Sequence, residues 1–182
     1  ADGRMNDDVV GDLEKVFWAV VNKEPGYETI KTVVIDSGSE LQNIDLQNIV
    51  NEAVRSSSRR KSVDDIWQED YGKNTAKLRR VLRWFRDAPV NVVITALLKK
   101  VLPPTEHNVL KDAEVEPVEV LPQFTNKLGE SVMGYMDFVW YMYVNNEGER
   151  CLLTQEKGPF RAKTRGVHFA DAIGQVVKNP NL

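Results

Sequence analysis

The sequence predicts a mixed α/β fold built around a mostly parallel sheet. Two short apolar runs, KTVVID (31–36) and VNVVITALL (90–98), show the continuous hydrophobic pattern of strands that are covered on both faces. Helical periodicity precedes the first run and fills much of the segment between the two. This order of strand, helix, helix and strand fits an α/β sheet with right-handed crossovers.

Three segments carry the helical periodicity. In residues 9–21 the apolar side chains recur at spacings of three and four, which places them on one stripe of a helix that ends before Pro25. A second helix is expected at about 41–54, after a Ser-Gly-Ser turn that can cap it. A third is expected at about 74–87, where a proline follows.

The last third of the chain predicts antiparallel structure. Two apolar strands, 137–144 and 149–155, flank the turn sequence Asn-Asn-Glu-Gly, which indicates a hairpin. One more strand is expected at 159–164 and a short helix at 169–177. Residues 99–125 are rich in proline and acidic side chains, so we expect a long loop there.

Length and composition predict one domain over residues 1–182. A chain of 182 residues with 42% hydrophobic positions is long enough for one substantial core without a disulfide or metal. Its lone Cys151 predicts a reduced, partly buried thiol, which suits the cytoplasm. The sequence shows neither an 18-residue apolar run nor a signal peptide, so we expect no membrane association. A formal charge of −3 leaves any nucleic-acid binding to local basic clusters.

Asp36 is the most informative single residue, because it ends a buried apolar strand. Open α/β sheets bind ligands at the carboxyl ends of their strands. In P-loop enzymes the Walker B motif is such a strand, and its Asp holds the magnesium ion of the nucleotide, often through water. We therefore expect Asp36 and the adjacent Ser37 to contact a nucleotide and its magnesium. The alternative is an Asp that only caps the following helix.

Three longer stretches carry a resemblance to a known family: YETIKTVVIDSGSEL, DYGKNTAKLRRVLRWFRDAPVNVVITA and YVNNEGERCLLTQEKGPFRAKTRG. Together they resemble phage-encoded RecA-like P-loop ATPases that act in recombination and single-strand annealing, over about residues 26–166. The resemblance implies a RecA-like three-layer αβα core with a mostly parallel sheet and a C-terminal antiparallel hairpin. It also implies ATP and magnesium at the subunit interfaces of a ring or filament in the cytoplasm of a bacterial host.

The same resemblance assigns roles to further residues. Thr95 matches the position that senses the nucleotide, although Ala96 follows where the family often has a polar residue or histidine. Lys163 and Arg165 match a Lys-x-Arg element that reaches the nucleotide of the neighbouring subunit, where cations neutralise charge on the transferred phosphoryl group. The alternative is a solvated edge strand, since Arg161, Lys163 and Arg165 share one face.

The sequence departs from the family in one respect, because it contains no Gly-Lys-Ser/Thr phosphate-binding loop. Its Gly72-Lys73 pair is followed by Asn74 and is not preceded by a strand. We expect the N-terminal strand and P-loop to precede Ala1, so that the chain is a fragment of a longer protein. The longer protein is then a DNA-dependent ATPase, whereas the chain alone binds nucleotide weakly and does not hydrolyse it.

A basic segment at residues 55–61 provides a candidate DNA contact through Arg59, Arg60 and Lys61. Single-stranded DNA, other copies of the chain and a phage or host single-strand-binding protein are the expected partners. A solvated basic surface is the alternative for these three residues. Two other functions stay open: a non-catalytic module that binds DNA or a replication protein, and a structural phage assembly protein.

Overall fold

The computed structural model describes residues 8–56, 59–60, 62–103, 116–125 and 128–180. These residues form two compact units. Unit 1 takes its described residues from Ala1–Leu97 and Gln123–Val132, and unit 2 from Leu98–Pro122 and Met133–Leu182. A single domain over the whole chain stays a prediction.

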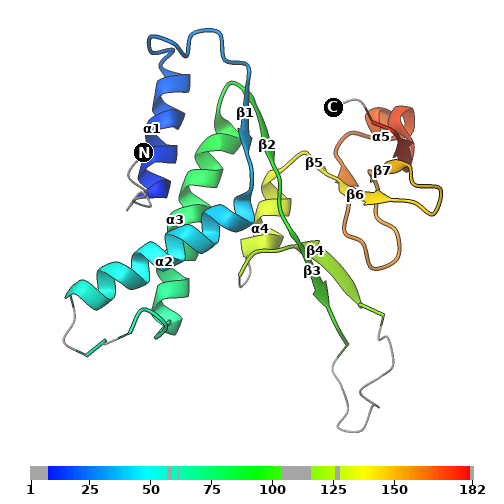
Figure 1. Cartoon of the computed structure of the whole chain (residues 1–182). Helices are drawn as coiled ribbons and strands as arrows, with labels where there is room; N and C mark the ends of the chain where they lie inside the picture. Colours follow the sequence, from blue (N-terminus) through cyan, green and yellow to red (C-terminus); the bar gives the residue numbers. More distant parts are fainter. Residues whose placement is uncertain (1–7, 57–58, 61, 104–115, 126–127, 181–182) are drawn as a thin grey trace, which may run out of the picture. The chain divides into compact units, whose positions relative to one another are not determined.

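Unit 1 is mostly helical with one pair of strands, whereas unit 2 is mostly strands (Figure 1). The elements of unit 1 are α1 (Val9–Val21), β1 (Thr32–Ile35), α2 (Gly38–Ser56), α3 (Gln68–Asp87), β2 (Asn91–Ile94) and the first residues of α4 (Leu128–Tyr135). Those of unit 2 are the last residues of α4, β3 (Leu98–Val101), β4 (Glu119–Pro122), β5 (Phe138–Val139), β6 (Tyr141–Val144), β7 (Arg150–Leu153), β8 (Lys163–Thr164), α5 (Val167–Ile173) and β9 (Val176–Lys178).

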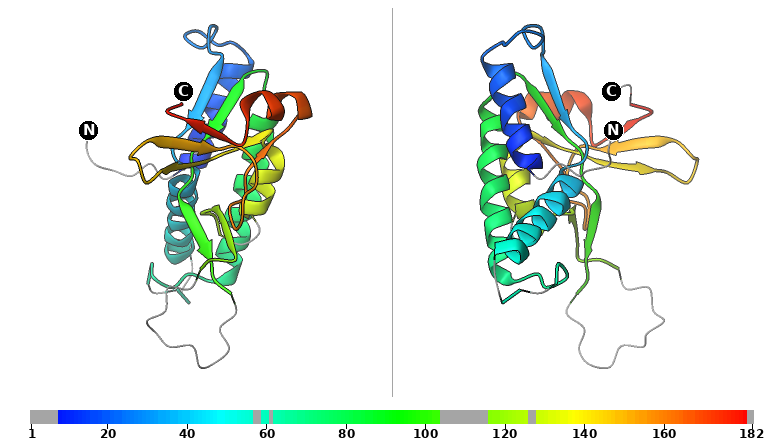
Figure 2. Two further views of the ribbon diagram at one scale, coloured as in Figure 1. Left: turned by 90° about the vertical axis from the view of Figure 1, so that its right-hand side faces the viewer. Right: turned by 60° about the vertical axis from the view of Figure 1, so that its left-hand side comes forward.

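The two apolar runs form a parallel pair in unit 1. Strand β1 pairs with β2 in a register that sets Val34 against Val93. Helices α1 and α3 lie on the same side of this pair (Figure 2), and Ile35 is buried. Val34 is 59% exposed and Val93 47% exposed, so one face of the pair is open where the sequence predicts cover on both faces. The β-branched composition of the runs indicates strands, but it does not report what lies over them.

A mostly parallel sheet is not what the described strands form. The pair β1–β2 is parallel, while β3–β4, β5–β8, β6–β7 and β7–β9 are antiparallel. The predicted C-terminal hairpin is confirmed in β6 and β7, where the Asn145 side chain accepts hydrogen bonds from the N–H groups of Glu147 and Glu149. The architecture shown is therefore mixed α/β.

The segment predicted as a long loop contains two strands instead. Residues Leu98–Val101 pair with Glu119–Pro122, and residues 104–115 between them lie outside the described part. Lys99 and Lys100 interrupt the apolar pattern of the first strand, and Pro122 is tolerated because it lies at a strand end. The predicted strand 90–98 is divided instead, because β2 stops at Ile94 and Leu98 begins β3.

Helix boundaries also differ from the sequence prediction. Helix α3 begins at Gln68 rather than near Asn74, because its first turns bury Asp70 and Asn74 against polar partners instead of apolar ones. Helix α5 covers Val167–Ile173, after which Gly174 has φ +74 and the chain continues into β9 instead of more helix. Helix α4 was not predicted at all.

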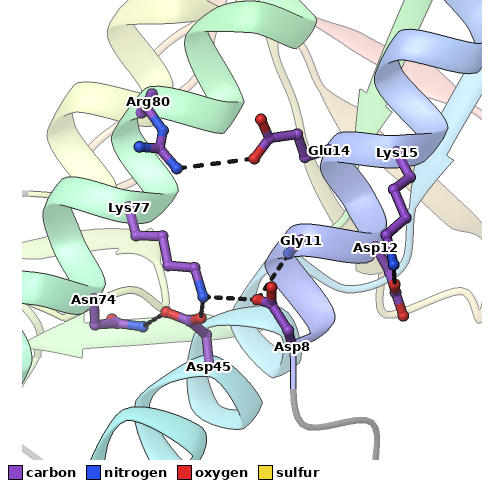
Figure 3. A network of polar contacts seen from close by, with 9 residues as sticks. All are labelled: Asp8, Gly11, Asp12, Glu14, Lys15, Asp45, Asn74, Lys77 and Arg80. Carbon is purple, nitrogen blue, oxygen red and sulfur yellow. Dashed lines mark hydrogen bonds and ion pairs between the residues drawn. The ribbon is translucent and has the colours of Figure 1, made fainter.

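A polar network joins the helices of unit 1, and Figure 3 shows the part of it around Asp45 and Lys77. Gln42 of α2 donates to the Asn74 side chain on α3 at 2.9 Å, and Asn74 donates to Asp45 at 2.9 Å. Lys77 then bridges Asp45 and Asp8, at 2.8 and 2.9 Å. Asp45 is completely buried, so its charge depends on these partners for compensation. The network therefore fixes how α2 and α3 pack and how α1 begins.

Gln42 also reaches the segment that returns from β4. Its amide donates to the Thr125 hydroxyl at 2.5 Å, and its carbonyl oxygen accepts the Thr125 N–H at 2.7 Å. Substitution Gln42→Ala leaves several buried groups without partners, and we expect it to lower the free energy of unfolding by about 2–4 kcal/mol. Urea denaturation measures the change.

The control is Gln47→Ala on the same helix, because Gln47 donates only to Asn51 one turn away, at 3.3 Å. We expect this control to change stability by less than about 0.5 kcal/mol. Equal effects of the two substitutions would contradict the role given to the network.

Candidate functional site

The carboxyl ends of β1 and β2 bring Asp36 and Thr95 together. The Thr95 N–H donates to the Ile35 carbonyl at 3.0 Å, which continues the parallel ladder one residue beyond the strands. The Thr95 hydroxyl then donates to the Asp36 carboxylate at 2.6 Å. Both side chains are exposed. The two residues that the sequence singled out on these strands are thus in direct contact and accessible to a ligand.

The start of α2 is held against this pair by its backbone. The Gly38 N–H donates to the Thr95 carbonyl at 2.8 Å. A Cβ atom on Gly38 would lie 2.9 Å from side-chain atoms of both Ile94 and Phe124, so only glycine fits between the helix and the end of β2. This close approach keeps the first turn of α2 beside Asp36.

Ser37 serves as the cap of α2. Its hydroxyl accepts the N–H of Glu40 at 3.2 Å, and its carbonyl accepts the N–H of Leu41 at 2.9 Å. The described hydrogen bonds therefore give the capping role, which was the alternative for Asp36, to Ser37. The Asp36 carboxylate accepts the Thr95 hydrogen bond and is otherwise exposed to solvent.

Ser39 is a part of the site that the sequence analysis missed. It is 2% exposed, its hydroxyl donates to the Gln123 carbonyl at 2.7 Å, and it accepts the Leu97 N–H at 3.0 Å. The residue thus ties α2 to the segment after β2 and to the segment after β4. No local signal distinguishes it, because both partners are backbone groups distant in sequence.

The residues at this site fit a hydrated magnesium ion. Magnesium keeps several of its waters and usually binds one or two carboxylates together with the phosphates of its nucleotide. Asp36 offers one exposed carboxylate, of which one oxygen accepts the Thr95 hydrogen bond. Among the described residues no cluster of three or more His, Cys, Asp or Glu side chains could hold a metal by itself. A single carboxylate is a ligand set that magnesium accepts when nucleotide phosphates and water supply the rest.

The two predicted cations, Lys163 in β8 and Arg165 just after it, lie in unit 2. Arg165 is exposed and pairs with Asp137 at 2.7 Å. Lys163 lines a cavity of about 230 Å³ with Val139, Ala162 and others. Burial, together with the nearby charge of Arg165, lowers the pKa of Lys163 below its ordinary value of 10.5. Of the two, Arg165 is the more accessible to a partner.

Arg161 lies two residues before β8 and pairs with Glu119 and Glu156. It is therefore compensated by two carboxylates, whereas among the described residues Arg165 forms its ion pair with Asp137 alone. The solvated edge strand therefore remains an adequate description of Arg161, whereas Lys163 and Arg165 remain candidates for binding an anion.

The basic segment needs one correction. The Arg60 side chain is 2% exposed, pairs with buried Asp70 at 2.7 Å and with Glu69 at 3.0 Å, and stacks on the Trp67 ring. A guanidinium committed in this way does not face DNA, so the predicted contact of Arg60 does not fit its placement. Arg59 is exposed, and Lys61 lies outside the described residues.

The fold and this site define a mixed α/β domain in which two parallel strands end in an acidic and a hydroxyl side chain beside the first turn of a helix, at the edge where open α/β sheets bind ligands. A family model described as an AAA domain matches residues 3–166. The chain belongs to the AAA domain family, a group of P-loop NTPase-like proteins that generally bind ATP with magnesium. No curated protein and no solved structure matches the chain.

The described residues also bear on membrane spans and on the single cysteine. None of the helices in the described ranges has the length and apolar character that crossing a membrane requires. Cys151 is a buried thiol without a disulfide.

A matched pair of glycines tests the fit of α2 beside Asp36. Substitution Gly38→Ala forces Ile94 or Phe124 to move, and we expect it to lower the free energy of unfolding by about 1–3 kcal/mol. Gly72 lies in α3, and a Cβ atom there would meet nothing within 4 Å, so Gly72→Ala should raise stability by up to about 1 kcal/mol. Thermal and urea unfolding measure both; a neutral Gly38→Ala contradicts the close fit.

The Arg60–Asp70 pair gives stability a defined dependence on pH. Burial alone raises the pKa of Asp70, but hydrogen bonds from Arg60 and from the Trp67 N–H outweigh it, so the pKa lies below 3.8. A lowered pKa means that the stabilisation is complete above the unfolded-state value and is lost as the pH falls through the folded-state value.

We expect Asp70→Asn to cost about 3–5 kcal/mol at pH 7, because it leaves a buried guanidinium without its carboxylate. The difference in free energy of unfolding from wild type should narrow as the pH falls from 7 to below 3.8, because Asp70 becomes protonated. Urea denaturation across this range measures it, and exposed Asp65→Asn is the control. A difference that stays constant with pH would show that the pair does not carry the effect.

Proposed function

We propose that the chain is the core of a RecA-like ATPase that acts on DNA in phage recombination or single-strand annealing. In this proposal ATP lies at subunit interfaces of a ring or filament. The family supports the coarser part, a nucleotide-binding, ATPase-like function. The RecA-like three-layer core, the DNA substrate and the assembly rest on the resemblance of the three sequence stretches.

One observation carries the proposal: the 2.6 Å hydrogen bond between Thr95 and Asp36 at the ends of two parallel strands. A hydroxyl that touches the acidic residue of a strand end lies where it can respond to a phosphate and its metal. Asp36 would hold a water of the magnesium ion, which neutralises charge on the phosphates when bound. Thr95 orients that carboxylate, and Ser37 and Gly38 keep the helix start beside it.

The cations of unit 2 complete the proposed chemistry from a neighbouring subunit. Charge that builds up on a transferred phosphoryl group is stabilised by cations supplied in cis or in trans. Arg165 is exposed and its partner Asp137 is exposed as well, so their ion pair is weak and exchangeable. Lys163 and Arg165 are therefore the residues that we assign to the neighbour's nucleotide.

Asp36→Ala tests the assignment in the full-length gene product. We expect ATP turnover in the presence of single-stranded DNA to fall by about 100-fold or more, because the metal loses its protein carboxylate. Asp65→Ala, an exposed acidic residue away from the site, should keep wild-type turnover. Equal turnover in wild type and Asp36→Ala would refute the role of Asp36.

A non-catalytic module that binds DNA or a replication protein is the second candidate. A complete reading frame that encodes no Gly-Lys-Ser/Thr loop would favour this candidate. The two candidates separate on one experiment, because a binding module retains salt-sensitive binding to single-stranded DNA in Asp36→Ala and shows no ATP turnover in any variant. Fluorescence anisotropy with a labelled oligonucleotide, titrated at several salt concentrations, measures this.

A further inference from the structure

The strand that carries Lys163 and leads directly into Arg165 is held by very little backbone pairing. Strand β8 consists of Lys163 and Thr164, and its partner β5 is equally short. The register sets Phe138 against Thr164 and Val139 against Lys163. A ladder of two residue pairs specifies register weakly, so the orientation of the cations depends on side-chain contacts.

The Thr164 hydroxyl supplies such a contact on the face opposite to Lys163. It accepts the indole N–H of Trp140 at 3.1 Å and donates to the Thr154 carbonyl at 2.9 Å. Thr154 is 1% exposed, and its own hydroxyl donates to the Gly174 carbonyl at 2.5 Å. Thr164 is thus anchored to the end of β7 and, through Thr154, to the end of α5.

Alternation along the strand places Lys163 on the other face. Successive side chains of a strand point to opposite sides, so Thr164 faces the side opposite to Lys163, and Arg165 follows directly after the strand. The cavity lined by Lys163 and Val139 agrees with this, because these two residues are register partners. The Arg165 N–H donates to the Asp137 carbonyl at 2.9 Å, which continues the pairing beyond β8.

We propose that Thr164 is the positioning residue of this cationic strand: its hydroxyl, held between Trp140 and Thr154, sets the direction in which Arg165 and Lys163 are presented. The inference rests on the proposed function, in which both cations act on the nucleotide of a neighbouring subunit. Thr164 itself touches no nucleotide. Its loss would leave the Trp140 N–H and the buried Thr154 carbonyl without a partner and allow β8 to shift.

The closest test is Thr164→Val, which keeps the shape of the side chain and removes its hydroxyl. In the full-length protein we expect kcat for ATP to fall by about 10- to 100-fold, since a misplacement of about 1 Å is enough for such a loss. Nucleotide affinity should stay within about twofold, because the Asp36 and Thr95 site is in the other unit. Thr164→Ser keeps the hydroxyl and should retain most of the wild-type kcat.

Two further variants sharpen the test. Trp140→Phe breaks the same link from the other end while keeping an aromatic ring, and should lower kcat in the same direction as Thr164→Val. Thr29→Val makes the same chemical change at an exposed residue of unit 1 and should behave as wild type. Mixing Thr164→Val with Asp36→Ala subunits should restore turnover, because the second variant supplies a correctly presented Arg165 to the intact site of the first.

A readout independent of turnover is the indole N–H resonance of Trp140, which Trp140→Phe identifies in the nitrogen–proton NMR spectrum. In Thr164→Val the chemical shift of this resonance should change and its proton should exchange faster with water. In Thr164→Ser both should stay as in the wild type. If the wild type turns over ATP and Thr164→Val has the same kcat, the positioning role is overturned while the proposed function stands. The same holds if Thr164→Val and Thr164→Ser lower kcat equally. Absence of turnover in the wild type would overturn the proposed function and this inference with it.

Discussion

Three hydrogen bonds between the ends of β1 and β2 are the constraint on which the candidate site depends. They join the Thr95 N–H to Ile35, the Gly38 N–H to the Thr95 carbonyl, and the Thr95 hydroxyl to Asp36. Asp36 and Thr95 are 59 residues apart, so only the parallel register brings them together. A slip of one residue would turn every side chain of a strand to the opposite face and separate the pair. The chemistry of the site is therefore a consequence of strand register before it is a property of any one side chain.

Much of unit 1 could be predicted from the sequence, because its signals are local and repetitive. The apolar stripe of α1 and the two apolar runs identify the helix and the strands, and the rule that ligands meet the carboxyl ends of parallel strands identifies Asp36. Contact between Asp36 and Thr95 agrees with that rule, while their functional roles stay predictions. The prediction that both faces of these strands are covered was wrong, since Val34 and Val93 are exposed. Hydrophobicity indicates what a side chain prefers, but it does not say which segment of the chain reaches it.

The remaining features depend on partners that no local pattern reveals. Arg60 looks like a solvated cation next to Arg59 and Lys61, yet it is buried against Asp70 and Trp67. Asn74 and Gln42 break the apolar periodicity of their helices because they satisfy each other. Thr164 lies between the two residues that draw attention to β8, and its importance comes from Thr154, ten residues earlier. In each case the role of the residue depends on a contact between polar groups. The sequence shows that these groups are present but not which of them meet.

The long sequence separation between α2 and the residues that contact it affects how the protein folds during translation. Ser39 and Gln42 of α2 obtain their partners from Gln123 and Thr125, 84 and 83 residues further on. During translation the first helices and both parallel strands leave the ribosome well before these partners do, and closure of such distant contacts is entropically slow. The buried hydroxyl and amide of α2 must stay hydrated until then. Unit 1 thus reaches its native packing only after the chain has been synthesised past Thr125. Until then, the surfaces of α2 that pack against this later segment stay exposed, and the nascent chain is more prone to misfolding.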